Sequence, residues 1–173
     1  LFRVNAGGPA ATAIDGSGVD WGADTSANNS VYAISVDDNN TFTGAATNTP
    51  AAIKVIGEDE NSNVDGSVVP EAIFFPERGD NNVNAAHLEY GFPVVGGESY
   101  YVTIYYTENW DGIVANGPRQ FDVNVNGTAP SELADINPYA EGGDALGVAR
   151  QRTILVTQEA DDTVLNLAFL HEA

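Results

Sequence analysis

The stretch Tyr100–Gly127, YYVTIYYTENWDGIVANGPRQFDVNVNG, carries the pattern that decides the fold. Val102–Tyr106 places an apolar side chain at every second position, and Phe121–Val125 repeats the same alternation. Successive side chains of a strand point to opposite faces, so alternation of this kind is typical of strands that are buried on one side. The sequence therefore predicts two antiparallel strands that form a central hairpin.

The connection between these two strands, Thr107–Arg119, is far longer than the two to five residues that a hairpin requires. Connections of this length in a compact domain are usually functional or disordered. Its polar and aromatic candidates for binding are Glu108, Asn109, Trp110 and Asp111. A sugar ring offers an apolar C–H face and a rim of hydroxyls, which suits an indole beside acceptors and an amide. Trp110 could instead fold back and plug its own loop.

Composition limits the possible classes of protein. A chain of 173 residues fits one domain with a full core, and the absence of cysteine excludes thiol catalysis and cysteine metal sites. Six basic residues against 25 acidic ones give a net charge of −19, which repels nucleic acid and anionic membranes. No apolar run is long enough to insert into a membrane. The acidic excess fits a salty medium or calcium, so we expect an extracellular or cell-surface location.

Further strands are predicted by short alternating stretches between turn residues, and no apolar periodicity of a helix extends over ten residues. They lie near Phe2 and Val4, at Tyr32–Val36, Ala72–Phe75, Leu88–Phe92, Val148–Val156 and Val164–Phe169, with Leu165, Leu167 and Phe169 directed inward. Many short strands without helices indicate an all-β chain, folded as an antiparallel, jelly-roll-like β-sandwich. No repeat or second domain is visible.

Two acidic loops are candidates for calcium. Asp59–Asp65 has acidic and amide side chains at alternate positions, but Val64 stands where a calcium loop needs its turn glycine, and Glu71 stands one residue beyond the closing position. A solvated loop is the stronger interpretation. Asp15 and Asp24 flank Trp21 in the other loop. The sequence does not decide whether either loop binds metal, and calcium is the ion that such acidic loops would take.

Several short motifs occur in an order that resembles a known family. They are VNAGG at Val4–Gly8, the Asp-Gly pair and Trp21 that follow, PER at Pro76–Arg78, FDVNVNG at Phe121–Gly127, Asp135-Ile136, and LNLAFLHEA at the end. This set resembles malectin domains, above all the bacterial ones that occur as modules of large secreted or surface proteins. The resemblance implies a jelly-roll-like sandwich that binds carbohydrate through aromatic and acidic loop side chains. Animal relatives prefer α-linked diglucosides.

Positions carried over from the family imply an altered sugar site. Tyr32 matches one sugar-contacting tyrosine, and Phe74 matches another but lacks the hydroxyl. Trp110 falls in an aromatic pair of the family, with Asp111 in place of the second aromatic. A site that recognises its ligand through a hydrogen bond changes its specificity strongly when that hydrogen bond is lost. The diglucoside preference of the animal relatives is therefore not expected of this chain. Tyr32 could also be a core residue, because Ile34 lies on its face of the strand.

The family usually continues past Ala173 with an acidic contact residue and a closing strand. We therefore expect residues 1–173 to be a single malectin-like domain, an excised module that lacks this strand and has neighbouring modules in a parent chain. An uncovered edge beside Leu165–Phe169 would then invite pairing with another chain.

Supporting roles are expected for three residues outside the long loop. Asn5 would cap backbone groups, and Glu77 with Arg78 would form an ion pair that positions a loop. His87 and His171 are expected to be structural.

The sequence thus predicts a non-catalytic module that binds an oligosaccharide or polysaccharide, possibly containing glucose, and requires no cofactor. A calcium-stiffened adhesion module that binds a protein or a cell-surface glycan is the alternative. A glycoside hydrolase needs two carboxylates at a fixed separation, and nothing in the sequence marks such a pair. Motifs for a serine nucleophile, zinc or phosphate are absent as well.

Overall fold

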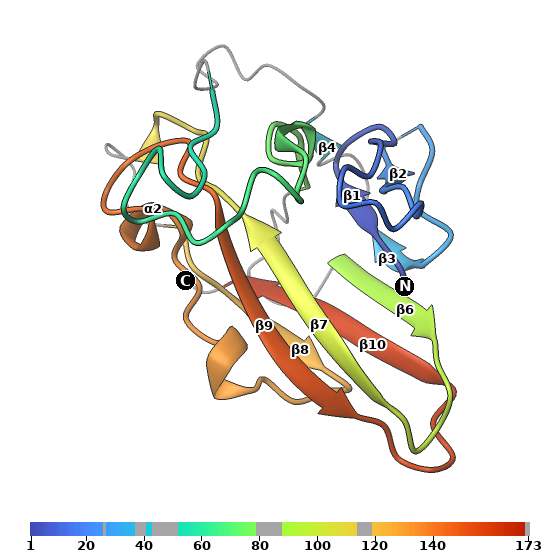
Figure 1. Ribbon diagram of the computed structural model, residues 1–173. Helices are drawn as coiled ribbons and strands as arrows, with labels where there is room; N and C mark the ends of the chain where they lie inside the picture. Colours follow the sequence, from blue (N-terminus) through green and yellow to red (C-terminus); the bar gives the residue numbers. More distant parts are fainter. Residues whose placement is uncertain (26, 37–40, 43–51, 79–87, 114–118, 172–173) are drawn as a thin grey trace.

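The computed structural model describes residues 1–25, 27–36, 41–42, 52–78, 88–113 and 119–171 (Figure 1). Strands dominate this part of the chain, and the helices are short. The elements are β1 (Val4–Ala6), β2 (Gly22–Asp24), β3 (Ala33–Val36), β4 (Thr41–Phe42), η1 (Glu71–Ile73), β5 (Glu77–Arg78), β6 (Leu88–Pro93), β7 (Ser99–Tyr106), β8 (Phe121–Val125), η2 (Ser131–Leu133), α2 (Pro138–Glu141), β9 (Arg150–Thr157) and β10 (Val164–His171).

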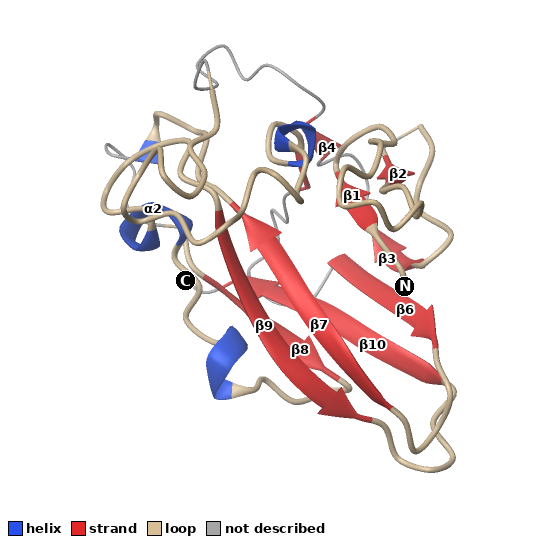
Figure 2. Cartoon of the chain, viewed as in Figure 1, coloured by secondary structure: helices blue, strands red, loops and turns tan. Residues whose placement is uncertain are grey.

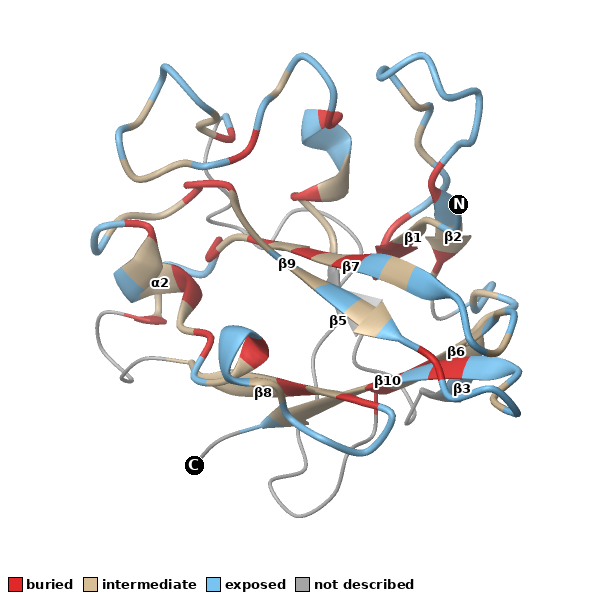
Figure 3. Cartoon of the chain, turned by 60° about the horizontal axis from the view of Figure 1, so that its bottom comes forward, coloured by how far each residue is buried: buried red, intermediate tan, exposed pale blue. Residues whose placement is uncertain are grey.

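Two antiparallel sheets form the body of the molecule. One sheet has the strand order β3-β6-β10-β8, and the other contains β7 and β9 (Figure 2). Figure 3 shows the pair β7–β9 and the pair β8–β10 as separate layers. Two smaller ladders are present as well, β1–β2 parallel and β4–β5 antiparallel. The predicted antiparallel sandwich is therefore confirmed.

The predicted central hairpin is wrong, although both of its strands exist. β7 pairs with β9, with Tyr101 opposite Leu155, and β8 pairs with β10, with Val123 opposite Phe169. The connection after Thr107 therefore crosses from one sheet to the other. Alternation shows that a strand is half-buried, but it does not identify the strand beside it. Here the two apolar faces meet across the core instead of lying side by side.

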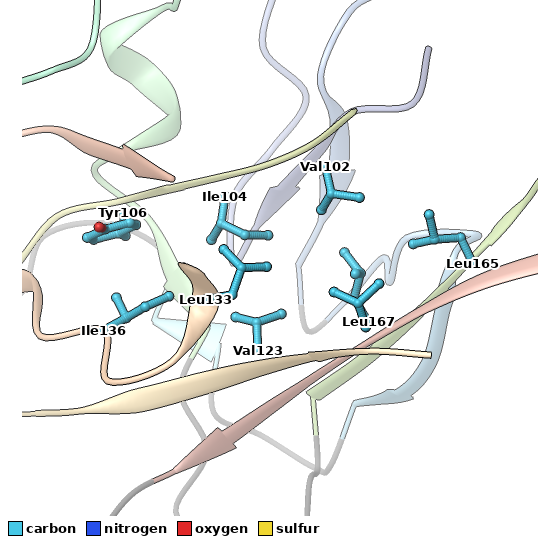
Figure 4. Packing of buried hydrophobic residues seen from close by; sticks show 9 residues of the cluster. Val102, Ile104, Tyr106, Val123, Leu133, Ile136, Leu165 and Leu167 are labelled. Carbon is cyan, nitrogen blue, oxygen red and sulfur yellow. The ribbon is translucent and has the colours of Figure 1, made fainter. Parts of the chain in front are cut away.

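The main core fills the space between the sheets. Its buried members are Val102, Ile104, Tyr106, Val123, Val125, Leu133, Ile136, Leu165 and Leu167. Figure 4 shows the side chains from β7 facing those from β8 and β10, with Leu133 and Ile136 among them. Complete burial of an aliphatic side chain contributes roughly 1.5–3 kcal/mol. This cluster therefore holds the two sheets together.

The expected open edge beside Leu165–Phe169 is wrong too. β10 lies between β6 and β8, so Leu167 has Tyr90 as its partner on one side and Val125 on the other. A strand with neighbours on both sides offers no edge for another chain.

Ala72–Phe75 was predicted as a strand, and it forms the short 3-10 helix η1 with its C-cap at Phe74. Pro70 precedes this turn and Pro76 follows it, which limits it to a few residues. The buried Phe74 takes its place in a second cluster rather than in a sheet.

This second cluster lies against the β7–β9 sheet, on the side away from the main core. Its buried members are Trp21, Ile53, Val64, Val69, Phe74 and Ala149. Trp21 packs edge-on against Tyr105 of β7, with ring centroids 5.5 Å apart, and the guanidinium of Arg3 lies 5.4 Å from the Trp21 ring. Hydrogen bonds from Arg3 hold the pKa of Asp15 well below its usual value. The polar loop around Trp21 is thus fixed over the sheet.

We expect Leu133→Ala to lower the free energy of unfolding by about 2–5 kcal/mol, because it leaves a cavity between the sheets where this leucine is 0% exposed. Leu155→Ala is the matched control, since its side chain is 58% exposed, and it should change stability by about 0.5 kcal/mol or less. Urea denaturation measures both variants. Equal losses would contradict the placement of η2 in the core.

Candidate functional site

The loop that follows β7 begins with a buried carboxylate. Glu108 is 1% exposed, and its carboxylate accepts hydrogen bonds from Nε of Arg119 at 2.9 Å and from the backbone N–H of Trp110 at 2.8 Å. The terminal guanidinium nitrogen of Arg119 completes the ion pair. The backbone carbonyl of Glu108 accepts a hydrogen bond from the Gly147 N–H at 2.8 Å. A buried carboxylate is tolerated only when it is paired in this way.

Glu108 was expected to meet sugar hydroxyls, and this expectation needs correction. Its carboxylate points inward and holds the first and last residues of the loop together. We therefore assign it a positioning role rather than direct contact with a ligand.

Trp110 packs against its own loop and still reaches the solvent. The guanidinium of Arg119 lies 5.5 Å from the ring centroid, and a Cβ on Gly112 would come within 2.2 Å of indole Cε2 and Cζ2. Only glycine permits the backbone to approach the ring so closely. Trp110 nevertheless remains 36% exposed. The ring is therefore fixed by its own loop and keeps a free surface, and its contact with sugar stays a prediction.

Phe74 and Asn109 lie beneath the surface instead of on it. Phe74 is 3% exposed, and its backbone carbonyl accepts a hydrogen bond of 2.6 Å from Nδ2 of Asn109, which is 6% exposed. The buried Oδ1 of Asn109 has no hydrogen-bond partner within the described part of the chain. The expected stacking surface at Phe74 is absent because its ring fills the second cluster. Asn109 fixes this segment to the loop.

Tyr32 belongs to a different aromatic group. Its half-buried ring lies 5.3 Å from Phe2 and 5.0 Å from Phe92, measured between ring centroids. In Figure 1, β3 lies beside β1 and β2, whereas the yellow segment beyond β7 runs to the other side of the molecule. Among the described residues, no ring contact or hydrogen bond joins Tyr32 to Trp110. The structure therefore does not place these two candidates in one contact group.

The remaining candidates belong to separate elements of the chain. Asp111 is exposed beside Trp110. Asn5 is buried and donates through Nδ2 to the carbonyl of Pro9 at 2.8 Å, and its supporting role at a site stays a prediction. Glu77 and Arg78 form β5, but their side chains lie outside the described part of the structure, and so does His87.

The acidic loop at Asp59–Asp65 is held by protein groups. The carboxylate of Asp59 accepts from the backbone N–H of Asn61 at 3.0 Å and from Nζ of Lys54 at 3.2 Å, and these bonds lower its pKa. Within the described ranges, no three histidine or acidic side chains gather closely enough to hold a metal ion. Calcium binding stays a prediction.

Sequence reasoning missed Arg119. Two signals could have identified it: it is one of only six basic residues in a strongly acidic chain, and it ends the long loop that Glu108 begins. A pair of opposite charges at the two ends of a connection is consistent with closure by an ion pair, but the sequence does not show which of many acids is buried.

Comparisons with known proteins identify the family. The sequence model of the malectin domain matches residues 1–169, so the chain belongs to the malectin family. A comparison with curated protein sequences finds no match.

Solved structures share the fold. The extracellular domain of ANXUR1 from Arabidopsis thaliana is 18% identical, with a TM-score of 0.74, and the match covers 98% of this chain and 42% of that chain. The plant receptor-like kinase FER is 19% identical with a TM-score of 0.75, and the match covers 98% of this chain and 43% of that one. A chain in the complex of the plant peptide RALF23 with FER and LLG2 is 20% identical, with a TM-score of 0.75. The match covers 98% of this chain and 42% of that chain.

The chain therefore spans less than half the length of these neighbours. No helix in the part of the chain that the structure describes is long and apolar enough to cross a membrane.

We expect Arg119→Met to lower the free energy of unfolding by about 2–3 kcal/mol, because it leaves the buried Glu108 carboxylate without its guanidinium. This estimate lies below the value for a fully buried pair because Arg119 is 39% exposed. Lys54→Met is the control, since Lys54 is 43% exposed in its pair with Asp59, and should cost about 1 kcal/mol or less. Equal losses of stability in the two variants would show that the burial of the Glu108 carboxylate does not require Arg119.

Proposed function

We propose that this chain is a non-catalytic carbohydrate-binding module of a larger extracellular protein, and that the loop after β7 carries its binding site. The observation that carries the proposal is the state of Trp110, whose indole is fixed by Arg119 and Gly112 while 36% of it faces solvent. An exposed large aromatic held in one orientation loses little conformational freedom on binding, so its stacking energy is retained. Membership of the malectin family supports the same conclusion.

The surroundings of Trp110 suit a neutral sugar. Its indole offers an apolar surface to the C–H face of a pyranose, and the exposed Asp111 can accept hydrogen bonds from hydroxyls. The net charge of −19 disfavours anionic glycans, so we propose a neutral ligand such as a glucose-containing oligosaccharide. Tyr32 and Phe2 form a separate aromatic group that could contact a longer chain. One stacked sugar with a few hydrogen bonds gives affinities on the order of micromolar to millimolar.

Catalysis is not part of the proposal. A glycosidase needs two carboxylates that face the same glycosidic bond. Glu108 is engaged by Arg119 and turned away from the surface, so it cannot act together with Asp111 across a sugar. Useful avidity would come instead from neighbouring modules of a parent chain. The extracellular domain of ANXUR1 shares the fold, which supports an extracellular location for this chain.

The proposal is tested by a glycan array with wild-type protein and Trp110→Ala, followed by calorimetry on each saccharide that binds. We expect Trp110→Ala to weaken binding about tenfold or more, because it removes the stacking surface. Tyr101→Ala is the matched control, since this ring is 78% exposed on β7, away from the long loop, and should bind as wild type does.

Two outcomes would contradict the proposed site. A Trp110→Ala variant that binds as tightly as wild type would place the ligand elsewhere. Binding that disappears when EDTA removes calcium would support the calcium-stiffened adhesion module instead. Circular dichroism of every variant confirms that the loss does not come from unfolding.

A further inference from the structure

The lower half of the β7–β9 sheet presents an exposed face. Tyr101 is 78% exposed and lies directly opposite Leu155, which is 58% exposed. Paired hydroxyls flank them on both sides. The residues of this surface, called the Tyr101 face below, are Ser99, Tyr101, Thr103, Thr153, Leu155 and Thr157. Among the described residues, the second cluster contacts this sheet near Tyr105, and in Figure 1 the lower parts of β7 and β9 lie in front of the other labelled strands.

The Tyr101 face is pre-organised for contact. Ser99 and Thr157 are hydrogen-bonded at 2.8 Å between their hydroxyl oxygens, and Thr103 and Thr153 at 2.9 Å. Hydroxyls that already satisfy one another lose less when a partner removes water from them. β7 and β9, which carry these side chains, pair without interruption from Ser99 to Tyr106. A rigid tyrosine with an aliphatic neighbour and a polar rim has the composition of a protein interface.

Carboxylates lie at the end of this face. The turns next to Ser99 and Thr157 carry the exposed Glu98, Glu159 and Asp161. The two turns are joined, since Gln158 N–H donates to the carbonyl of Glu98 at 2.9 Å.

These acids have no described cation beside them. The basic side chains that the structure describes form ion pairs elsewhere: Arg3 with Asp15, Lys54 with Asp59, Arg119 with Glu108, and Arg150 and Arg152 with Glu141. The negative potential at this end of the face is therefore not neutralised by a described ion pair. Such a potential attracts cations and steers their approach.

We propose that the Tyr101 face docks a basic polypeptide segment. Its apolar side chains would cover Tyr101 and Leu155, and its lysine or arginine side chains would meet the carboxylates of Glu98 and Glu159. A neutral glycan could use the tyrosine ring but not the charge, and a second copy of this chain would bring its own charge of −19 against the first. The site is distinct from the proposed sugar site, because Glu98 precedes β7 and Trp110 follows it.

The test is an NMR titration of ¹⁵N-labelled protein with a capped peptide made of three Lys-Gly-Leu-Lys repeats. We expect saturable shifts at the backbone amides of Ser99–Thr103 and Thr153–Thr157. Tyr101→Ser combined with Leu155→Ser should weaken binding about tenfold or more, because the apolar centre is lost. Glu98→Gln combined with Glu159→Gln should weaken it about two- to fivefold, and added salt should do the same to wild type.

Matched controls separate this face from general attraction to an acidic protein. Glu60→Gln with Asp144→Asn removes two exposed charges elsewhere and should change the affinity less than about twofold. A peptide with serine in place of leucine should bind more weakly than the leucine peptide. Trp110→Ala should leave peptide binding unchanged even if it abolishes binding of sugar.

Two results would overturn the proposal. Shifts scattered over the acidic surface, with no effect of the double serine variant, would show attraction by charge alone. Shifts at Tyr101 and Leu155 with maltohexaose but not with the basic peptide would make this face a glycan surface. The substituted side chains are exposed, so circular dichroism should show that all variants remain folded.

Discussion

The pairing of the buried Glu108 with Arg119 is the interaction on which the candidate site depends. The chain leaves one sheet after β7 and enters the other at β8, and no described residue of this connection belongs to a ladder. The ion pair joins its two ends, and the Trp110 backbone N–H bonds to the same carboxylate. A carboxylate in this environment is stable only with its partners. Closure of the loop and orientation of the indole therefore have one physical cause.

A second charged network attaches the helical turns to the sheets. Tyr106 donates to Glu141 at 2.5 Å, and Arg152 meets the same carboxylate at 2.7 Å and donates to the carbonyl of Ala134 at 2.7 Å. Burial, together with the Glu141 carboxylate, raises the pKa of the Tyr106 phenol. The ends of β7 and β9 are thereby fixed near the start of the long loop. This network therefore fixes the end of β7 from which the long loop starts, whereas the Glu108–Arg119 pair orients the indole.

The sequence predicted most strands, the sandwich and the family, because alternation reports half-burial and motif order reports ancestry. It could not predict which strands pair, since β7 and β8 have the same pattern whether they lie side by side or face to face. It also could not separate Trp110 from Phe74. Both match aromatic positions of the family's sugar site, but η1 turns Phe74 into the second cluster, while Gly112 and Arg119 hold Trp110 at the surface. Burial of Glu108 depends on Arg119, which lies 11 residues away.

The two tryptophans offer the most direct test of the central claim, that Trp110 is the fixed aromatic of a sugar site. Trp21 is 7% exposed in the second cluster and serves as an internal reference, whereas Trp110 is 36% exposed. Their indole N–H signals can be followed by NMR while neutral oligosaccharides are added. The account predicts a saturable shift of the Trp110 signal with the Trp21 signal unchanged. A saccharide that shifts backbone amides elsewhere and leaves the Trp110 indole unaffected would contradict it.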